Sequence, residues 1–254
     1  MDRNQTQTQL ISAYQRFKED FNSEGLKLED FSPPLLLNVT DDYCRAKMRF
    51  VVYGQETTGW DWTNHLQEQY PKYPNNWRFQ NQRTFADFLA NNDAIESLCW
   101  GYEQFAFAQY QPKNHNSPFW QAFREIQQWP GAGVMWSNLV RVDYRGGSIF
   151  SADQFAREAI LRQQCAVMLN ELQALNPDVC IFLTGPDYDR VLEIVFLKLD
   201  YERKDAAPVR EFARLVHAAL PRHSYRTYHP SHLRQSGKWS YLNVMRTSIT
   251  STSG

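Results

Sequence analysis

The sequence predicts an α/β fold: a single domain with a central, four-stranded, mostly parallel sheet flanked by helices. The first observation is the alternation of short apolar segments with helical ones in the second half of the chain. Such strands need crossover connections, which favour parallel pairing. The second observation is size, because 254 residues with 43% hydrophobic content suffice for one large core. We therefore assign residues 1–254 to one domain.

The first half of the chain supplies one strand and several helices. Residues 5–22 carry apolar side chains at helical spacing, and Pro33-Pro34 ends that segment. Residues 49–53 form the first core strand, which Gly54 terminates. The amide-rich and aromatic segment 60–116 is an expected helical insertion, with helices at 83–92 and 94–110. Pro118 then marks the first turn of another helix.

The second half supplies the alternation. Strands are predicted at 133–142, 178–185 and 224–228. Helices are predicted at 151–175, 188–199 and 208–220, and a last helical pattern runs from about residue 238. Residues 249–254 are polar and are expected to form a flexible tail.

Composition narrows the functional class. No apolar run reaches the roughly 20 residues of a membrane helix and the N-terminus lacks a signal pattern, so we expect a cytoplasmic protein without a membrane partner. The four cysteines form no C-x-x-C pair, so we expect neither a metal nor a cofactor. Net charge is −1, yet residues 203–246 hold nine basic and two acidic side chains. This segment is either a solvated face or a phosphate-binding surface.

Four polar loops follow or close the predicted strands: "GQETTGW" from Gly54, the stretch around Asn138, "TGPDYD" from Thr184 and "YHPSHLRQSGKW" from Tyr228. In a parallel sheet, ligands bind at the carboxyl ends of the strands. We therefore expect these loops to converge on one crevice.

The loops resemble the uracil-DNA glycosylase superfamily. Gly54-Gln55-Glu56 is similar to its first motif, Asn138 to its second, and His229-Pro230-Ser231-His232-Leu233 to its last, in the same order. The resemblance spans roughly residues 48–245. It implies an enzyme that flips a base out of DNA and hydrolyses its N-glycosidic bond, leaving an abasic site. None of the three motifs contains a lysine, so the implied enzyme is a monofunctional glycosylase, which we expect to be a monomer.

The resemblance also implies roles for single residues. Glu56 would stabilise the sugar cation and orient water, and His229 would donate a hydrogen bond to the departing base. Leu233 would be the wedge that enters the duplex. The base would be read by Gln55, Asn138 and Thr58 and stacked on Trp60, Phe119 or Trp120; the DNA backbone would be held by Ser231, Arg234, Gln235 and Lys238.

Each assignment has a structural alternative. Glu56 is otherwise a solvated turn residue, Asn138 a strand-end amide, His229 a structural histidine and Leu233 a core residue.

Two departures from the family pattern concern the substrate. Glu56 replaces an aspartate, and Thr57-Thr58-Gly59 replace Pro-Tyr-His, whose tyrosine excludes 5-substituted bases in uracil enzymes. Smaller side chains leave room, so we expect a bulky 5-substituted pyrimidine, such as the glucosylated hydroxymethylcytosine of phage DNA, and a role in antiviral defence. The alternatives are a uracil-excising repair glycosylase, a non-catalytic module that binds modified DNA, and a hydrolase of free nucleosides.

Overall fold

The computed structural model describes residues 1–60, 82–107, 116–204 and 206–250. The predicted α/β class with a helix-flanked sheet is confirmed, but the sheet has six strands, in the order β2-β1-β3-β6-β5-β4. The first four neighbours run parallel: β2 (Ala132–Val140), β1 (Met48–Glu56), β3 (Val179–Phe182) and β6 (His223–Thr227). They correspond to the four predicted strands.

The last two strands correct the prediction. β5 (Phe212–Val216) lies within the segment predicted as a helix at 208–220, and β4 (Asp200–Arg203) precedes it. Both pair antiparallel, β5 with β6 and β4 with β5. Phe212, Leu215 and Val216 have a spacing that fits a helix, but pairing along β6 satisfies the backbone of this segment and buries Phe212 completely.

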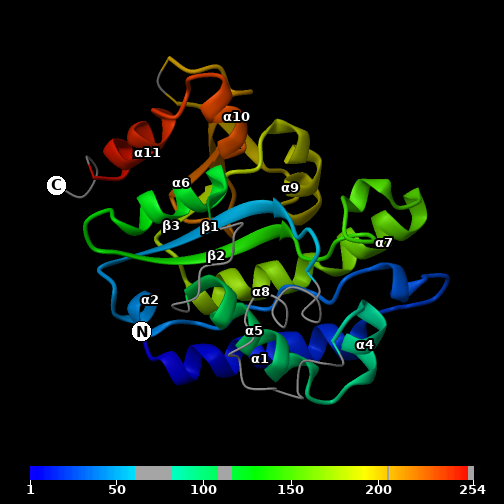
Figure 1. The fold of residues 1–254 in the computed structure, drawn as a ribbon. Helices are drawn as coiled ribbons and strands as arrows, with labels where there is room; N and C mark the ends of the chain where they lie inside the picture. The colour runs from blue at the N-terminus through cyan, green and yellow to red at the C-terminus, as the bar shows by residue number, and fades with distance from the viewer. Residues whose placement is uncertain (61–81, 108–115, 205, 251–254) are drawn as a thin grey trace.

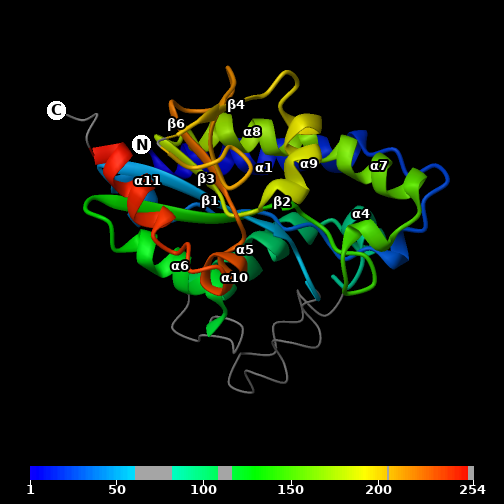
Figure 2. The same cartoon turned by 90° about the horizontal axis from the view of Figure 1, so that it is seen from above.

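Two helical layers cover the sheet. α8 (Cys165–Leu175) lies on one face with α1 (Arg3–Asp20) packed on it, whereas α6 (Pro118–Gln127) and α10 (Pro230–Gln235) lie together on the other (Figures 1 and 2). The remaining α-helices are α2 (Asp41–Arg45), α4 (Phe85–Ala90), α5 (Ala94–Phe107), α7 (Gln154–Gln163), α9 (Asp189–Val195) and α11 (Tyr241–Thr250). Short 3₁₀ turns are η1 (Leu28–Asp30), η4 (Ile149–Ser151) and η5 (Pro186–Tyr188).

The predicted helix 151–175 is two helices, α7 and α8, separated at Gln164. This side chain is 3% exposed and accepts a hydrogen bond from the Arg141 backbone N–H (3.0 Å). Of the predicted insertion, α4 and α5 are present, whereas residues 61–81 and 108–115 lie outside the described residues. Of the predicted tail, 251–254 lie outside them too, while α11 continues to Thr250.

A buried ion pair ties the end of β2 to the helical layer. Arg141, 1% exposed, contacts Glu171 of α8, and Tyr14 of α1 donates a hydrogen bond to the same carboxylate (2.6 Å). Burial raises the pKa of Glu171, which Arg141 opposes. Arg141 also reaches the Ser137 hydroxyl (3.3 Å), so the network fixes the strand segment that presents Asn138.

No helix in the described part of the chain is long and apolar enough to span a bilayer.

Candidate functional site

The carboxyl ends of the parallel strands bring the predicted loops to one edge of the sheet. Glu56 is the last residue of β1, and Gly54 pairs in register with Asn138 of β2. Gly185 follows β3, and its N–H donates to the Thr227 carbonyl at the end of β6 (2.9 Å). His229 comes two residues after β6. The expected convergence of the four loops is therefore present.

Glu56 is half-buried, and both of its carboxylate oxygens accept a hydrogen bond. The Tyr188 hydroxyl donates to Oε1 (2.6 Å) and the Ile149 backbone N–H donates to Oε2 (2.9 Å). Ile149 follows β2 and Tyr188 follows β3, so loops from both neighbouring strands hold the carboxylate of β1. Glu56 is therefore a positioned side chain and not a solvated turn residue.

Tyr188 is a site residue that the sequence did not single out. It lies in the loop "TGPDYD", within the expected crevice, but a tyrosine there has no distinctive pattern. It is 7% exposed and packs edge-on against Phe150 at 5.3 Å between ring centres. Burial, and then the bond to Glu56, raise the pKa of Tyr188 well above its ordinary value. The phenol therefore keeps its proton and remains a donor to the carboxylate.

Asn138 is presented beside Gly54. A Cβ at position 54 would lie 2.4 Å from Asn138 Oδ1 and 3.1 Å from the Phe119 ring, so only glycine allows both side chains to close over this part of β1. Asn138 is 5% exposed, and its amide has no hydrogen-bond partner among the described residues. The amide is therefore available to hydrogen-bond a ligand.

His229 precedes α10 and caps it. Its Nδ1 accepts the Ser231 backbone N–H (3.3 Å), so the proton of the neutral ring lies on Nε2. Burial lowers the pKa of His229, which favours this neutral form. The ring is nearly parallel to Phe119, at 13° and 6.3 Å between centres. His229 thus offers one N–H donor beside an aromatic face.

The three aromatic residues predicted to stack on the base have different surroundings. Phe119 lies beside Gly54 and His229. Trp120 and Trp60 instead pack around the Trp136 ring, at 5.0 and 5.9 Å between ring centres. Phe119 is therefore the aromatic residue that lines the candidate site.

The remaining residues of the first loop have different surroundings. Gln55 donates from Nε2 to the Thr184 carbonyl (2.7 Å), which ties β1 to the end of β3 and leaves the amide oxygen of Gln55 available. Thr58 is exposed. Thr57 and Thr184 are nearly buried, and their hydroxyls have no hydrogen-bond partner in the structure. These two hydroxyls add to the unsatisfied polar groups at this edge.

The predicted wedge is not supported. Leu233 is 0% exposed on α10, so its side chain is a core residue and cannot enter a duplex unless α10 moves. The sequence motif places a leucine at this position, but the helix that begins at Pro230 turns it inward. Its alternative, a core role, is the one that the structure bears out.

The predicted backbone-binding residues are partly engaged within the protein. Ser231 is half-buried and Gln235 is exposed. Arg234 is exposed, bonds Gln121 and stacks on Trp239, whereas Lys238 pairs with Glu211 (2.6 Å).

The basic segment 203–246 is also less basic than its sequence indicates. Arg226 is 1% exposed and pairs with Asp189, while Arg210 and Arg214 pair with Asp187 and Glu202. These three acids lie outside the segment and reduce its excess of seven positive charges to four. Much of the segment therefore serves internal ion pairs.

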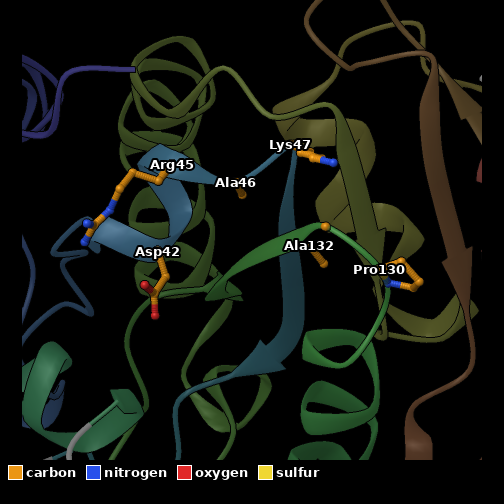
Figure 3. A pocket seen from close by; sticks show the side chains of 7 residues that line it. Asp42, Arg45, Ala46, Lys47, Pro130 and Ala132 are labelled. Carbon is orange, nitrogen blue, oxygen red and sulfur yellow. The ribbon is translucent and has the colours of Figure 1, made fainter.

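The hollow in Figure 3 lies at the other end of the sheet from Glu56. It has a volume of about 660 Å³ and is lined by Asp42, Arg45, Ala46, Lys47, Pro130, Gly131 and Ala132. These residues precede or begin β1 and β2. Its lining carries Asp42, Arg45 and Lys47 but none of the residues of the four polar loops.

Among the described residues, no group of three or more His, Cys, Asp or Glu side chains is placed to hold a metal ion. Comparisons of the chain with protein-family models, with curated proteins and with solved structures found no match.

Proposed function

We propose that the protein is a monofunctional DNA glycosylase that hydrolyses the N-glycosidic bond of a flipped-out base. The observation that carries the proposal is the convergence, in motif order, of a held carboxylate, an unpartnered amide and a neutral imidazole at one sheet edge: Glu56, Asn138 and His229. Each matches one demand of the reaction.

Glycosidic cleavage separates charge between the sugar and the base. As the bond breaks, its electron pair moves to the base and the sugar becomes cationic. Glu56 supplies a negative charge for that cation and an acceptor for the proton of the water that adds to the sugar carbon. Each of its oxygens already accepts one hydrogen bond, which fixes its direction and leaves a second lone pair on each for the water.

The departing base carries the negative charge. The Nε2–H of His229 is a preorganised donor for its oxygen, a kind of interaction worth about 3 to 4 kcal/mol in other enzymes. Asn138 offers a donor and an acceptor to the edge of a pyrimidine, and Phe119 offers a face for stacking. Gln55 retains an amide oxygen for a further contact.

For the substrate we propose a bulky 5-substituted pyrimidine in DNA, such as glucosylated hydroxymethylcytosine in phage DNA. Thr57, Thr58 and Gly59 leave space where a tyrosine would exclude a 5-substituent. The unpaired hydroxyls of Thr57 and Thr184 are suited to a polar substituent. The proposal places the protein in the cytoplasm as a monomeric antiviral enzyme.

The test is to incubate the protein with oligonucleotides that contain uracil, hydroxymethylcytosine or glucosylated hydroxymethylcytosine, and to score alkali-labile abasic sites. We expect cleavage of the glucosylated substrate, and losses of two or more orders of magnitude in Glu56→Gln and His229→Ala. Glu19→Gln, at an exposed position on α1, is the matched control and should keep full activity.

The possible results separate the candidate functions. DNA binding without cleavage of any substrate would favour a non-catalytic module, and excision of uracil alone would favour repair. Thr58→Tyr should impair excision of the largest base first. Equal activity of this variant on all bases would overturn the proposal that Thr58 leaves room for a 5-substituent.

A further inference from the structure

Two arginines from different helices contact the same residue beside the candidate site. The Arg190 guanidinium, from α9, lies over the Phe150 ring at 3.7 Å from its centre. Arg157, from α7, donates from Nη1 to the Phe150 carbonyl (3.4 Å). Arg190 is exposed and Arg157 is half-buried. Stacking and hydrogen bonding therefore hold two positive charges on η4.

Neither arginine has a carboxylate partner within 4 Å among the described residues, although other arginines of this region do. Arg162 pairs with Glu158, Arg210 with Asp187 and Arg226 with Asp189.

Acids near the two arginines in sequence are engaged elsewhere. Glu158, next to Arg157, pairs with Arg162 (3.8 Å). Asp153 caps α7 by accepting the Ala156 N–H (3.0 Å), and Asp189 is held by Arg226. Two like charges fixed on one residue repel each other, and this cost falls when an anion binds between or beside them.

The position of the pair indicates which anion. Phe150 packs against Tyr188, whose hydroxyl holds Glu56, and Ile149, next to Phe150, holds the other oxygen of the same carboxylate. An anion bound here would be part of a molecule that also reaches the candidate site. Planar guanidinium groups match the oxygens of a phosphodiester, to which they can donate two parallel hydrogen bonds.

We propose that Arg157 and Arg190 bind a backbone phosphate next to the nucleotide whose base enters the site. The identity of the anion as nucleic acid rests on the proposed function, whereas the anion site itself rests on the geometry of η4. The site complements the loop after β6, where Lys238 is paired with Glu211 and Arg234 bonds Gln121. DNA would then be gripped on the α7 and α9 side of Glu56.

The test on DNA is the salt dependence of binding. The dissociation constant of a fluorescent duplex or single strand is measured by anisotropy from 50 to 200 mM NaCl for the wild type, Arg157→Gln and Arg190→Gln. Each phosphate contact contributes about 0.9 to the slope of log K against log salt for duplex DNA and about 0.7 for single strands. We expect each variant to lose about that much of the slope and Arg190→Lys to retain it. Slopes equal to that of the wild type in all variants would overturn the proposal.

The matched control is Arg162→Gln, on the same helix as Arg157 but paired with Glu158. It should leave the slope unchanged. Thermal melting of all variants identifies any that fail to fold, and Arg190→Lys then serves as the conservative comparison.

A second measurement does not depend on the proposed function. Inorganic phosphate is titrated into the whole protein while the arginine Nε–Hε resonances are followed by NMR. We expect the signals of Arg157 and Arg190 to shift together, and those of Arg162 to stay. Shifts without any DNA binding or cleavage would keep the anion site and remove the glycosylase proposal. Glycosylase activity together with unshifted arginine signals and unchanged salt slopes would keep the glycosylase proposal and remove the anion site.

Discussion

Replacing Tyr188 with phenylalanine removes the side chain that, within the described part of the protein, donates a hydrogen bond to the Glu56 carboxylate. The change deletes a hydroxyl and keeps the ring against Phe150. A hydrogen bond to a charged group contributes about 1.5 to 3 kcal/mol. If the carboxylate needs this bond to face the sugar in the transition state, the same energy corresponds to a loss in kcat of about 10-fold to 150-fold.

The assay is single-turnover formation of abasic sites on the preferred substrate, with saturation curves to separate kcat from KM. Because Tyr188 positions Glu56 and the base is read by other residues, we expect kcat to fall and KM to change less than about 2-fold. The raised pKa of Tyr188 keeps its hydroxyl protonated, so the defect should be similar at neutral and mildly alkaline pH.

Tyr241→Phe is the matched control, because it deletes a phenol-to-carboxylate bond of the same length, to Glu211 (2.6 Å), on α11. This variant should keep the wild-type kcat. A folded Tyr188→Phe protein with wild-type kcat would refute the positioning argument, and equal losses in both variants would reduce it to a general effect on stability.

Three further predictions concern the same edge of the sheet. Gly54→Ala places a methyl group 2.4 Å from Asn138 Oδ1, so Asn138 must shift and excision should fall at least 10-fold. Gly147→Ala, whose added methyl group meets no atom closer than 3.6 Å, should be active. Leu233→Ala should lower the free energy of unfolding by about 2 to 5 kcal/mol in urea, whereas a wedge residue would leave it unchanged. Burial lowers the pKa of His229, so below about pH 6.5 the unfolded chain binds a proton at this histidine before the folded protein does, and the free energy of unfolding falls. His229→Gln should reduce the change in the free energy of unfolding between about pH 7 and 5. The same pH dependence in the variant and the wild type would contradict a buried, neutral His229.

The sequence was sufficient for the parallel part of the sheet, because β1, β2 and β3 are apolar strands and β6 follows them in the same alternation with helices. It was insufficient for β5, because the spacing of its apolar residues fits a helix. Only the pairing with β6, which the sequence does not reveal, makes this segment a strand. A local pattern shows the spacing of apolar residues in a segment, but it does not show which other segment hydrogen-bonds to its backbone.

The same limit applies to the site. Motif order predicted that Glu56, Asn138 and His229 lie at strand ends, and they do. The sequence did not indicate that Tyr188 bonds Glu56 or that Leu233 is buried, because a side chain's direction within a short turn or helix depends on packing. Ion pairs between distant segments, such as Arg226 with Asp189, likewise cannot be read from a local count of charges.

One of the two strands that the sequence did not predict, β4, also determines how the sheet ends. β4 is four residues long and mostly exposed, with Asp200, Glu202 and Arg203 along it, whereas the opposite edge strand, β2, is buried along nearly its whole length. Short, charged edges discourage the addition of strands from other molecules. An exposed apolar edge strand would instead pair with strands of neighbouring molecules. The charges of β4 therefore protect this edge of the sheet from edge-to-edge aggregation. Replacing them with valine or threonine would leave an edge to which a strand of another molecule could add.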